Sequence, residues 1–479
     1  MQFAEQIIEI QPLGSCAGKQ IALRHFQNRQ HDIDETRDQK KFEDRNIHCS
    51  GFHISAISLC NHKMMSLPAI TTADKPHAAF QSRDFRFFQM ARLSSVIASE
   101  MQAVAVGWQV YEITRSPLTL GYVGLVQFLP SILLFLLAGH TADRIDRRRI
   151  LLVCQFTFAI CSTLLLLYGL HGATSVLPIY AILLLHGTTR AFSGPAGQAL
   201  MPQLVPVEHF ANAVTWGSST FQVAMVIGPA LGGLLYAAMG GPLGVYGLAI
   251  GCYLFAVFFT AAVQMRTGRL EKRNVSLETL IAGFRYVWQK KIILGAISLD
   301  LFAVLLGGAV ALLPVFAKEI LDAGPWALGA LRSAPAAGAM FIAVIMAFHP
   351  LRRRAGVVMF FCVGIFGLST VFFALSRNLY LSILLLLMAG AADMVSVVVR
   401  QTLVQIATPP EMRGRVSAVN LIFIGASNEF GQFESGVTAH WMGTIPATIF
   451  GGVGTLLVVV LWWFGFPELR QMEKLTPQT

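Results

Sequence analysis

Twelve long apolar segments follow one another from Phe85 to Phe466, and short polar links separate them. Each segment can cross a bilayer as a helix, because a hydrocarbon core about 30 Å thick requires roughly 20 mostly apolar residues. Membrane barrels are built instead from alternating segments of about ten residues. We therefore predict an all-α polytopic membrane protein with twelve transmembrane helices. The predicted segments are 85–111, 118–138, 150–170, 176–196, 213–238, 243–263, 292–316, 327–348, 357–375, 379–403, 416–439 and 447–466.

Basic residues gather in the links on one side of the predicted membrane, whereas the other side carries only Arg115, Lys318 and Arg377. Cytoplasmic loops of membrane proteins carry the excess of Lys and Arg. Both termini are therefore predicted to face the cytoplasm. The basic links contain Arg144, Arg147, Arg148, Arg149, Arg266, Arg269, Lys272, Arg273, Arg285, Lys290, Lys291, Arg352, Arg353, Arg354, Arg413 and Arg415.

Composition narrows the class of protein further. Hydrophobic residues make up 54% of the 479 residues and charged residues 13%, against about 25% charged residues in a soluble domain. The net charge of +10 lies in the links and not in one basic domain, which argues against a nucleic-acid partner. The cysteines and histidines show no disulfide or metal-site spacing, and no phosphate-binding loop for ATP is found. We expect no cofactor, no metal and no enzymatic activity.

Two polar stretches divide the chain. Residues 1–84 are polar and lack apolar periodicity, so we expect either a disordered cytoplasmic tail or a wrongly assigned start, with the natural start at Met64 or Met65. Residues before about Met64 should then be dispensable. Residues 266–291 form a cytoplasmic central loop with a predicted amphipathic helix at 276–288. This loop separates an N-terminal six-helix bundle (85–265) from a C-terminal one (292–468), which a short cytoplasmic tail (469–479) follows.

The two halves repeat one another. One group of residues recurs 203 positions later, and Gly124 and Pro130 recur 205 positions later as Gly329 and Pro335. The same order on the same side of the membrane indicates parallel repeats, which are related by a pseudo-two-fold axis along the membrane normal. The first group pairs Gly187 with Gly390, Gln198 with Gln401, Leu200 with Leu403, Pro206 with Pro409 and Glu208 with Glu411.

The link after the second segment carries a recognisable motif. Its sequence, from Gly139 through Asp143, Arg144, Arg147 and Arg148 to Arg149, resembles the signature of the major facilitator superfamily. Thr141 and Asp146 replace the usual Leu and Gly, and Asp still permits a turn. The resemblance implies that Gly139 allows close helix contact, and that Asp143 and Arg144 help to hold the cytoplasmic side closed against the helix that begins near Val416.

Further stretches resemble a narrower group. Gly228, Pro229, Gly232 and Gly233 look like the end of a helix-bend motif of antiporting exporters, although Ala224 and Thr215 stand where Gly is usual. Residues 128–130, 194–198, 312–317 and 427–431 are similar to the bacterial transmembrane secretion effector family. That family includes enterobactin-exporter-like and macrolide efflux proteins. The resemblance covers about 85–469 and implies export across the bacterial inner membrane.

Several charged residues lie inside the apolar segments, where charge is costly and usually faces a cavity or a partner. The parent fold lines its cavity with the first and fourth helices of each half, which implies cavity positions for most of these residues. Structural ion pairs are the alternative. Glu100 and Asp300 have no opposite charge within one turn of their own helix, so they are the preferred candidates for proton coupling. The full set is Glu100, Arg190, Asp300, Arg332, Asp393, Arg400, Glu429 and Glu434.

These observations predict a secondary active transporter that exports an amphiphilic small molecule, such as a drug or siderophore, by proton-driven alternating access. An importer or lipid flippase on the same fold remains an alternative, because a fold does not fix a function. A non-transporting membrane sensor or scaffold is the alternative from another class. The expected partners are the substrate, protons and the lipid bilayer, and the expected oligomeric state is a monomer.

Overall fold

The computed structural model describes residues 77–264, 277–349 and 354–472, and its helices all belong to one compact unit. Most of the predicted N-terminal tail lies outside the described residues. The same holds for the basic segment 265–276, for Arg352 and Arg353, and for the last seven residues. The expectations for these segments therefore stay predictions.

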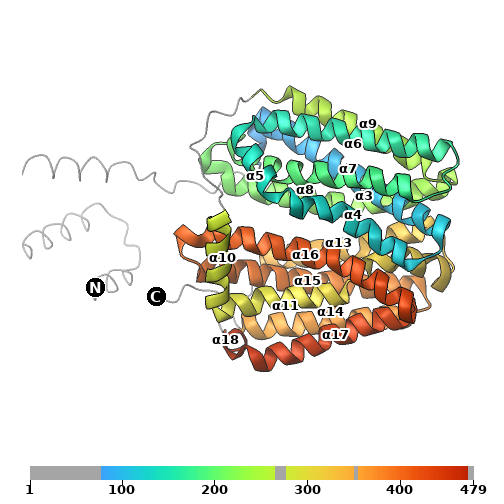
Figure 1. Cartoon of the computed structure of the whole chain (residues 1–479). Helices are drawn as coiled ribbons and strands as arrows, with labels where there is room; N and C mark the ends of the chain where they lie inside the picture. The colour runs from blue at the N-terminus through green and yellow to red at the C-terminus, as the bar shows by residue number, and fades with distance from the viewer. Residues whose placement is uncertain (1–76, 265–276, 350–353, 473–479) are drawn as a thin grey trace, which may run out of the picture. The chain divides into compact units, whose positions relative to one another are not determined.

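The N-terminal half consists of seven helices that form six spans (Figure 1). Helix α3 begins after Ser82, whose side chain accepts a hydrogen bond from the Phe85 N–H, and Asp146 caps α6 in the same way. Such caps satisfy amide groups that the first helical turn leaves unpaired. The helices are α3 (Arg83–Thr114), α4 (Pro117–Leu133), α5 (Phe135–Arg144), α6 (Arg147–Leu170), α7 (Leu177–Leu200), α8 (Phe210–Met239) and α9 (Leu243–Ala262).

The C-terminal half repeats this layout, and its first span is interrupted. Helix α11 (Lys291–Gly307) is followed by η5 (Ala309–Leu312), α12 (Leu313–Val315) and a π-helical turn, η6 (Phe316–Ile320). Pro314 lacks the amide proton that a regular helix would need here. The remaining helices are α13 (Pro325–Phe348), α14 (Ala355–Leu375), α15 (Leu379–Ala407), α16 (Pro410–Met442), α17 (Thr444–Gly465) and the short α18 (Pro467–Arg470).

Hydropathy alone identifies fewer spans than the fold contains. Within the described residues, eight helical stretches are long and apolar enough to cross a membrane, or nine when the bent pair α4 and α5 counts as one. The other three spans are α3, α7 and α16, which have 32, 24 and 33 residues. These three helices are long enough to cross a membrane, but their polar residues lower their mean hydropathy. The prediction of twelve spans in two six-helix bundles is confirmed.

Helix α10 (Leu277–Gln289) connects the two halves in the sequence and crosses the ends of the C-terminal helices at the left of Figure 1. It packs on α16, where the rings of Phe284 and Phe423 are 5.7 Å apart, and the Tyr286 hydroxyl donates to the Ala407 carbonyl. Trp288 stays 76% exposed. An amphipathic helix with an exposed aromatic side chain suits the interface between lipid and water.

The expected boundary of the N-terminal tail at residue 84 lies too late. A short 3-10 helix, η2 (Ala78–Gln81), precedes α3, and α3 itself begins at Arg83. Ala79 and Phe80 hold this segment against α8, because the Ala79 N–H donates to Asn212 Oδ1 and the Phe80 ring lies 5.0 Å from that of Trp216. Aromatic packing and this hydrogen bond order a segment that lacks any periodic pattern.

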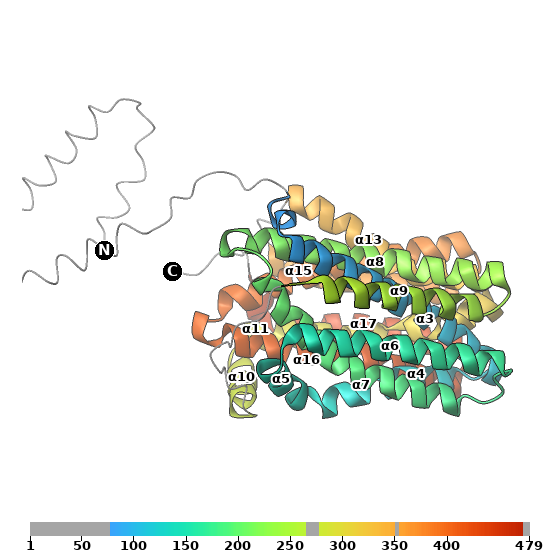
Figure 2. The ribbon, with the colours of Figure 1, turned by 90° about the horizontal axis from the view of Figure 1, so that it is seen from above.

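The two halves meet through two helix pairs, α4 with α16 and α8 with α13, and Figure 2 shows α8 and α13 side by side. Glycines lie at both crossings. An added Cβ on Gly233 would lie 2.8 Å from Gly329 Cα, and one on Gly436 would lie 2.8 Å from Gly121 Cα. Gly233 and Gly436 are 203 positions apart, the offset of the sequence repeat. The two crossings are therefore equivalent, and small residues allow the backbones to approach closely.

Gly187 and Gly390, which the repeat pairs, also have the same structural role. An added Cβ on Gly187 in α7 would collide with the Gln127 carbonyl of α4, and one on Gly390 in α15 would collide with the Pro335 carbonyl of α13. The repeat in sequence thus marks one close contact inside each half.

We expect Gly187→Ala and Gly390→Ala to lower the stability of the protein by about 1–3 kcal/mol each, because overpacking a tight contact costs this much. Gly364→Ala is the matched control, since nothing lies within 4 Å of the position of its added Cβ. Thermal unfolding of the detergent-purified variants measures the effect. Equal melting temperatures for all three variants would contradict the assigned contacts.

Candidate functional site

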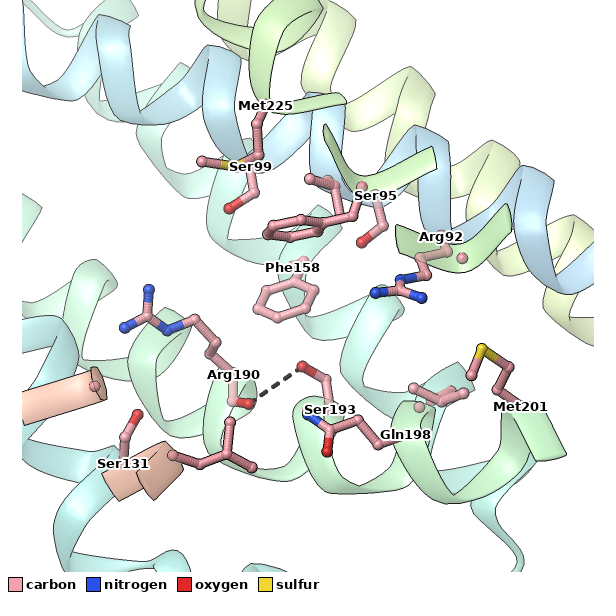
Figure 3. Close-up of a pocket in the computed structure, with 18 of the residues that line it drawn as sticks. Arg92, Ser95, Ser99, Ser131, Phe158, Arg190, Ser193, Gln198, Met201 and Met225 are labelled. Atoms are coloured by element: carbon pink, nitrogen blue, oxygen red, sulfur yellow. Dashed lines mark hydrogen bonds between the residues drawn. The ribbon is translucent and has the colours of Figure 1, made fainter. Parts of the chain in front are cut away.

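A cavity of 1110 Å³ lies mainly among the helices of the N-terminal half. Its walls come from α3, α4, α6, α7, α8, α9 and α16, mostly from the parts that lie toward the end of the bundle carrying the basic links, which we call the basic end. Residues from both halves line it, because α16 contributes Asn428 and Glu429. Figure 3 shows Arg92 and Arg190 on opposite sides of the Phe158 ring.

Two ion pairs near this cavity join the halves. Arg190 Nη2 of α7 lies 2.6 Å from Glu429 Oε1 of α16, and Arg332 Nε of α13 lies 3.8 Å from Glu100 Oε2 of α3. Three of these four residues, Arg190, Glu429 and Glu100, line the cavity. Each pair links one half to the other, so both must separate or rearrange if the halves move apart at this level.

Asp300, Asp393 and Arg400 are not among the residues that line this cavity, in contrast to the expectation. Arg400 Nη1 donates to Asp300 Oδ2 at 2.5 Å, and the two side chains are 2% and 7% exposed. Asp393, on the same face of α15 as Arg400, interacts electrostatically with both of them. These residues stay out of the cavity wall because of helix packing. Helix α15 lies against α13 and α14, and α11 lies against α16 and α17, so the three side chains point into the C-terminal bundle.

The acids of α16 have separate partners. Gln432 Nε2 donates to Glu429 Oε2 at 3.2 Å, whereas Glu434 accepts a hydrogen bond from Thr438 on the same helix at 2.7 Å. Asn428 donates to the Ile424 carbonyl. Glu434 does not line the cavity, so only Glu429 of the two acids belongs to the site.

At the opposite end of the bundle, the halves are joined by a group of polar contacts that the sequence analysis did not predict. Lys318 Nζ of η6 donates to Glu112 Oε1 of α3 at 2.9 Å, and the Tyr236 hydroxyl donates to the other Glu112 oxygen. The Tyr111 hydroxyl donates to Glu319 Oε1 at 2.5 Å. The sequence does contain a signal for these contacts. Glu112 follows the first apolar segment, and Lys318 and Glu319 follow the seventh.

The arginines of the signature link bind within the N-terminal half. Arg147 donates to the Ala199 carbonyl at the end of α7, and Arg148 donates to the Thr260 and Ala261 carbonyls at the end of α9. Basic side chains at helix C-termini satisfy carbonyls that the last turn leaves unpaired. These contacts join α6 to α7 and α9.

Asp143 and Arg144 are exposed, and Gly139 has no neighbour within 4 Å of an added Cβ. Helix α5, which carries them, packs mainly on α7. The described structure therefore does not bring Asp143 against the start of α16, where the resemblance places its partner.

The helix-bend glycines face two neighbours. Added Cβ atoms on Gly228 and Gly232 would approach Glu100 and Met101 of α3, whereas Gly233 faces α13. The Pro229 carbonyl lies 2.6 Å from the position of an added Cβ on Gly329 of α13. The motif thus brings α8 close to a helix of its own half and to one of the other half.

Comparisons with curated proteins agree on one activity. The enterobactin exporter EntS of Shigella boydii serotype 18 is 26% identical over 404 residues, which cover 82% of this chain and 94% of that protein. The EntS proteins of Escherichia coli O81 and Escherichia fergusonii show the same identity and coverage.

Solved structures agree on the fold. A POT family transporter in complex with a thioalcohol-conjugated peptide superposes with a TM-score of 0.65 at 12% identity, covering 81% of this chain and 96% of that chain. An inward-facing bacterial homologue of the lysosomal transporter Spinster superposes with a TM-score of 0.61 at 14% identity, covering 83% and 97%. A D-xylose-proton symporter superposes with a TM-score of 0.59 at 14% identity, covering 80% and 98%.

The family model of transmembrane secretion effectors matches residues 74–478, which is most of the chain. The predicted resemblance and the prediction of a multi-pass membrane transporter are thereby confirmed. The chain belongs to the transmembrane secretion effector family.

Proposed function

We propose that this protein is a secondary transporter that exports amphiphilic small molecules from the cytoplasm, driven by protons and acting as a monomer. The observation that carries the proposal is the position of the cavity. It lies toward the basic end, while the other end is closed by the Glu112–Lys318 pair and the glycine crossings between the halves. A cavity at one end and a closed opposite end are what one state of alternating access requires.

The buried charges support proton coupling. Asp300 pairs with Arg400 inside the C-terminal bundle, and Asp393 interacts electrostatically with both of them. Two carboxylates beside one cation leave a net negative charge, and taking an unpaired charge out of water is costly. Binding a proton removes that charge. Glu100 is the second coupling candidate, because it lies on the cavity wall. Its carboxylate is 3.8 Å from the Arg332 guanidinium, a long ion pair that a bound proton can replace.

Export fits the comparison with the EntS proteins, which are named enterobactin exporters. The basic end carries Arg144, Arg148, Lys290 and Lys291 among the described residues, and basic links face the cytoplasm. The cavity would then take its substrate from the cytoplasmic side of the bacterial inner membrane, which is the loading state of an exporter.

We expect reporter fusions after Thr479 and within 266–276 to report the cytoplasm, because both positions lie at the basic end of the predicted topology. A paired alkaline phosphatase and fluorescent protein fusion measures the side at each position. A fusion after Gly172, in the link between α6 and α7, is the periplasmic control. A periplasmic signal at either test position would reverse the proposed direction of transport.

We expect Asp143→Asn to favour the state described here, because the substitution removes a negative charge that would stabilise the closed basic end at the N-terminus of α16. The measurement is labelling of a Ser193→Cys cavity variant by a membrane-impermeant maleimide in inside-out vesicles. Labelling should become about 1.7- to fivefold faster, as expected for a helix-end charge worth roughly 0.3–1 kcal/mol. Glu208→Gln, another exposed acid at this end, is the control, and equal rates in both variants would argue against the role of Asp143.

We expect Glu100→Gln, Asp300→Asn and Asp393→Asn each to lose export driven by a pH gradient while energy-independent exchange survives, because an amide cannot take up a proton. When Asp300 is changed, the negative charge of Asp393 still interacts electrostatically with Arg400. Proteoliposomes loaded with a panel of acidic, neutral and cationic fluorescent amphiphiles measure both activities.

Glu468→Gln, an exposed acid on α18, is the control for these three variants and should behave as the unmodified protein. Full gradient-driven export in all three variants would contradict the assignment of proton coupling to these acids. Accumulation of the amphiphiles in the opposite direction would favour the importer alternative instead.

A further inference from the structure

Arg92 is a half-buried cation in the cavity wall with no ion pair or hydrogen bond to any residue that the structure describes. The other charged residues of the wall are paired, since Arg190 binds Glu429 and Glu100 lies beside Arg332. Arg92 therefore gives the cavity an uncompensated positive charge. A charge withdrawn from water is costly unless a partner of opposite charge is present, and an anionic substrate would supply that partner.

The guanidinium of Arg92 lies where a small residue leaves room for it. An added Cβ on Gly217 of α8 would lie 3.2 Å from Arg92 Nη1 and 3.8 Å from Gln89 Nε2. Both amide atoms of Gln89 are buried without a hydrogen-bond partner among the described residues. A planar guanidinium presents several donors that match a carboxylate, and Gln89 adds an unused amide nearby.

One aromatic ring lies near this charge, and others line the same cavity. The Phe221 ring lies 5.9 Å from Arg92 Cζ, and Phe158 lies 4.7 Å from the His186 ring and 5.4 Å from the Tyr253 ring. All of these rings line the cavity. Aromatic faces pack against flat apolar groups with preferred offset or edge geometry, so the wall favours a ligand that carries a ring.

Two further polar side chains in the wall have unused hydrogen-bonding capacity within the described part of the chain. His186 is 4% exposed and neither ring nitrogen has a partner, and Gln155 is 6% exposed with an unpaired Oε1. A buried polar atom without a partner costs free energy. Hydroxyl or amide groups on a bound ligand would satisfy both residues.

We propose that the cavity binds aromatic acids, with the anionic group on Arg92 and the ring against Phe158 and Phe221. Polar substituents on that ring would bond to His186 and Gln155. This inference rests on the proposed transport function for its physiological meaning, but binding itself requires no gradient.

The test is equilibrium binding to purified protein in phosphatidylcholine nanodiscs, followed by fluorescence anisotropy. The probes are anthracene carboxylate, the neutral anthracene carboxamide and the cationic aminomethyl-anthracene. We expect the carboxylate to bind at least about tenfold more tightly than the carboxamide, because a hydrogen bond to a charged group is among the stronger ones. The cation should bind most weakly.

Arg92→Gln should abolish this preference, and Arg92→Lys, which keeps the charge but not the fork of donors, should retain part of it. Arg86→Gln removes an exposed arginine from the same helix outside the cavity and should leave the preference unchanged. A folded Arg92→Gln variant that still prefers the carboxylate would overturn the proposal. If that variant does not fold, equal binding of carboxylate and carboxamide by the unmodified protein overturns it.

Two further measurements distinguish this inference from lipid binding and from the proposed transport function. If adding phosphatidylglycerol to the nanodiscs abolishes probe binding, the anion is a lipid headgroup and the aromatic-acid assignment falls. Gradient-driven transport of neutral or cationic amphiphiles without Arg92-dependent acid binding would overturn only the inference. Arg92-dependent acid binding without gradient-driven export would overturn only the proposed function.

Discussion

Charge inside an apolar bundle must be neutralised, and this constraint organises the structure. A charged side chain in the bilayer core is costly unless it finds a partner or water. Glu100 and Arg190 find theirs in the opposite half, whereas Asp300 finds Arg400 within its own half. Pairs between halves break when the halves move, and a pair within a half moves as one body. The same physical rule thus produces two kinds of ion pair with different consequences for transport.

Close backbone contact provides the second constraint. The glycine crossings of α4 with α16 and of α8 with α13 let the halves touch without intervening side chains. Small residues at these positions let the backbones approach closely, and aromatic side chains meet elsewhere along the α4–α16 contact, where the rings of Tyr122 and Phe433 are 5.5 Å apart. At the end opposite the basic links, Glu112 and Lys318 add a charged contact to this apolar one.

The halves are equivalent in fold but differ in chemistry. The cavity draws most of its wall from the N-terminal half, with Arg92, Phe158 and His186, while the C-terminal half holds the shared charges of Asp300 and Arg400. Repeated halves give each function the same framework of helices. Because the side chains differ, the N-terminal half supplies most of the cavity wall and the C-terminal half holds a buried ion pair.

The sequence by itself determined the twelve spans, the two halves and the pairing of Gly187 with Gly390, because these depend on segment length, local periodicity and repeat offset. Only the tertiary structure decided which charges meet. Helical periodicity places Asp393 and Arg400 on one face of a helix, but the neighbour of that face is set by packing among twelve helices. The surroundings of Arg92 are likewise set by packing, which leaves it without an ion-pair partner among the described residues. Partnership across helices is a property of the assembled bundle, and no local pattern encodes it.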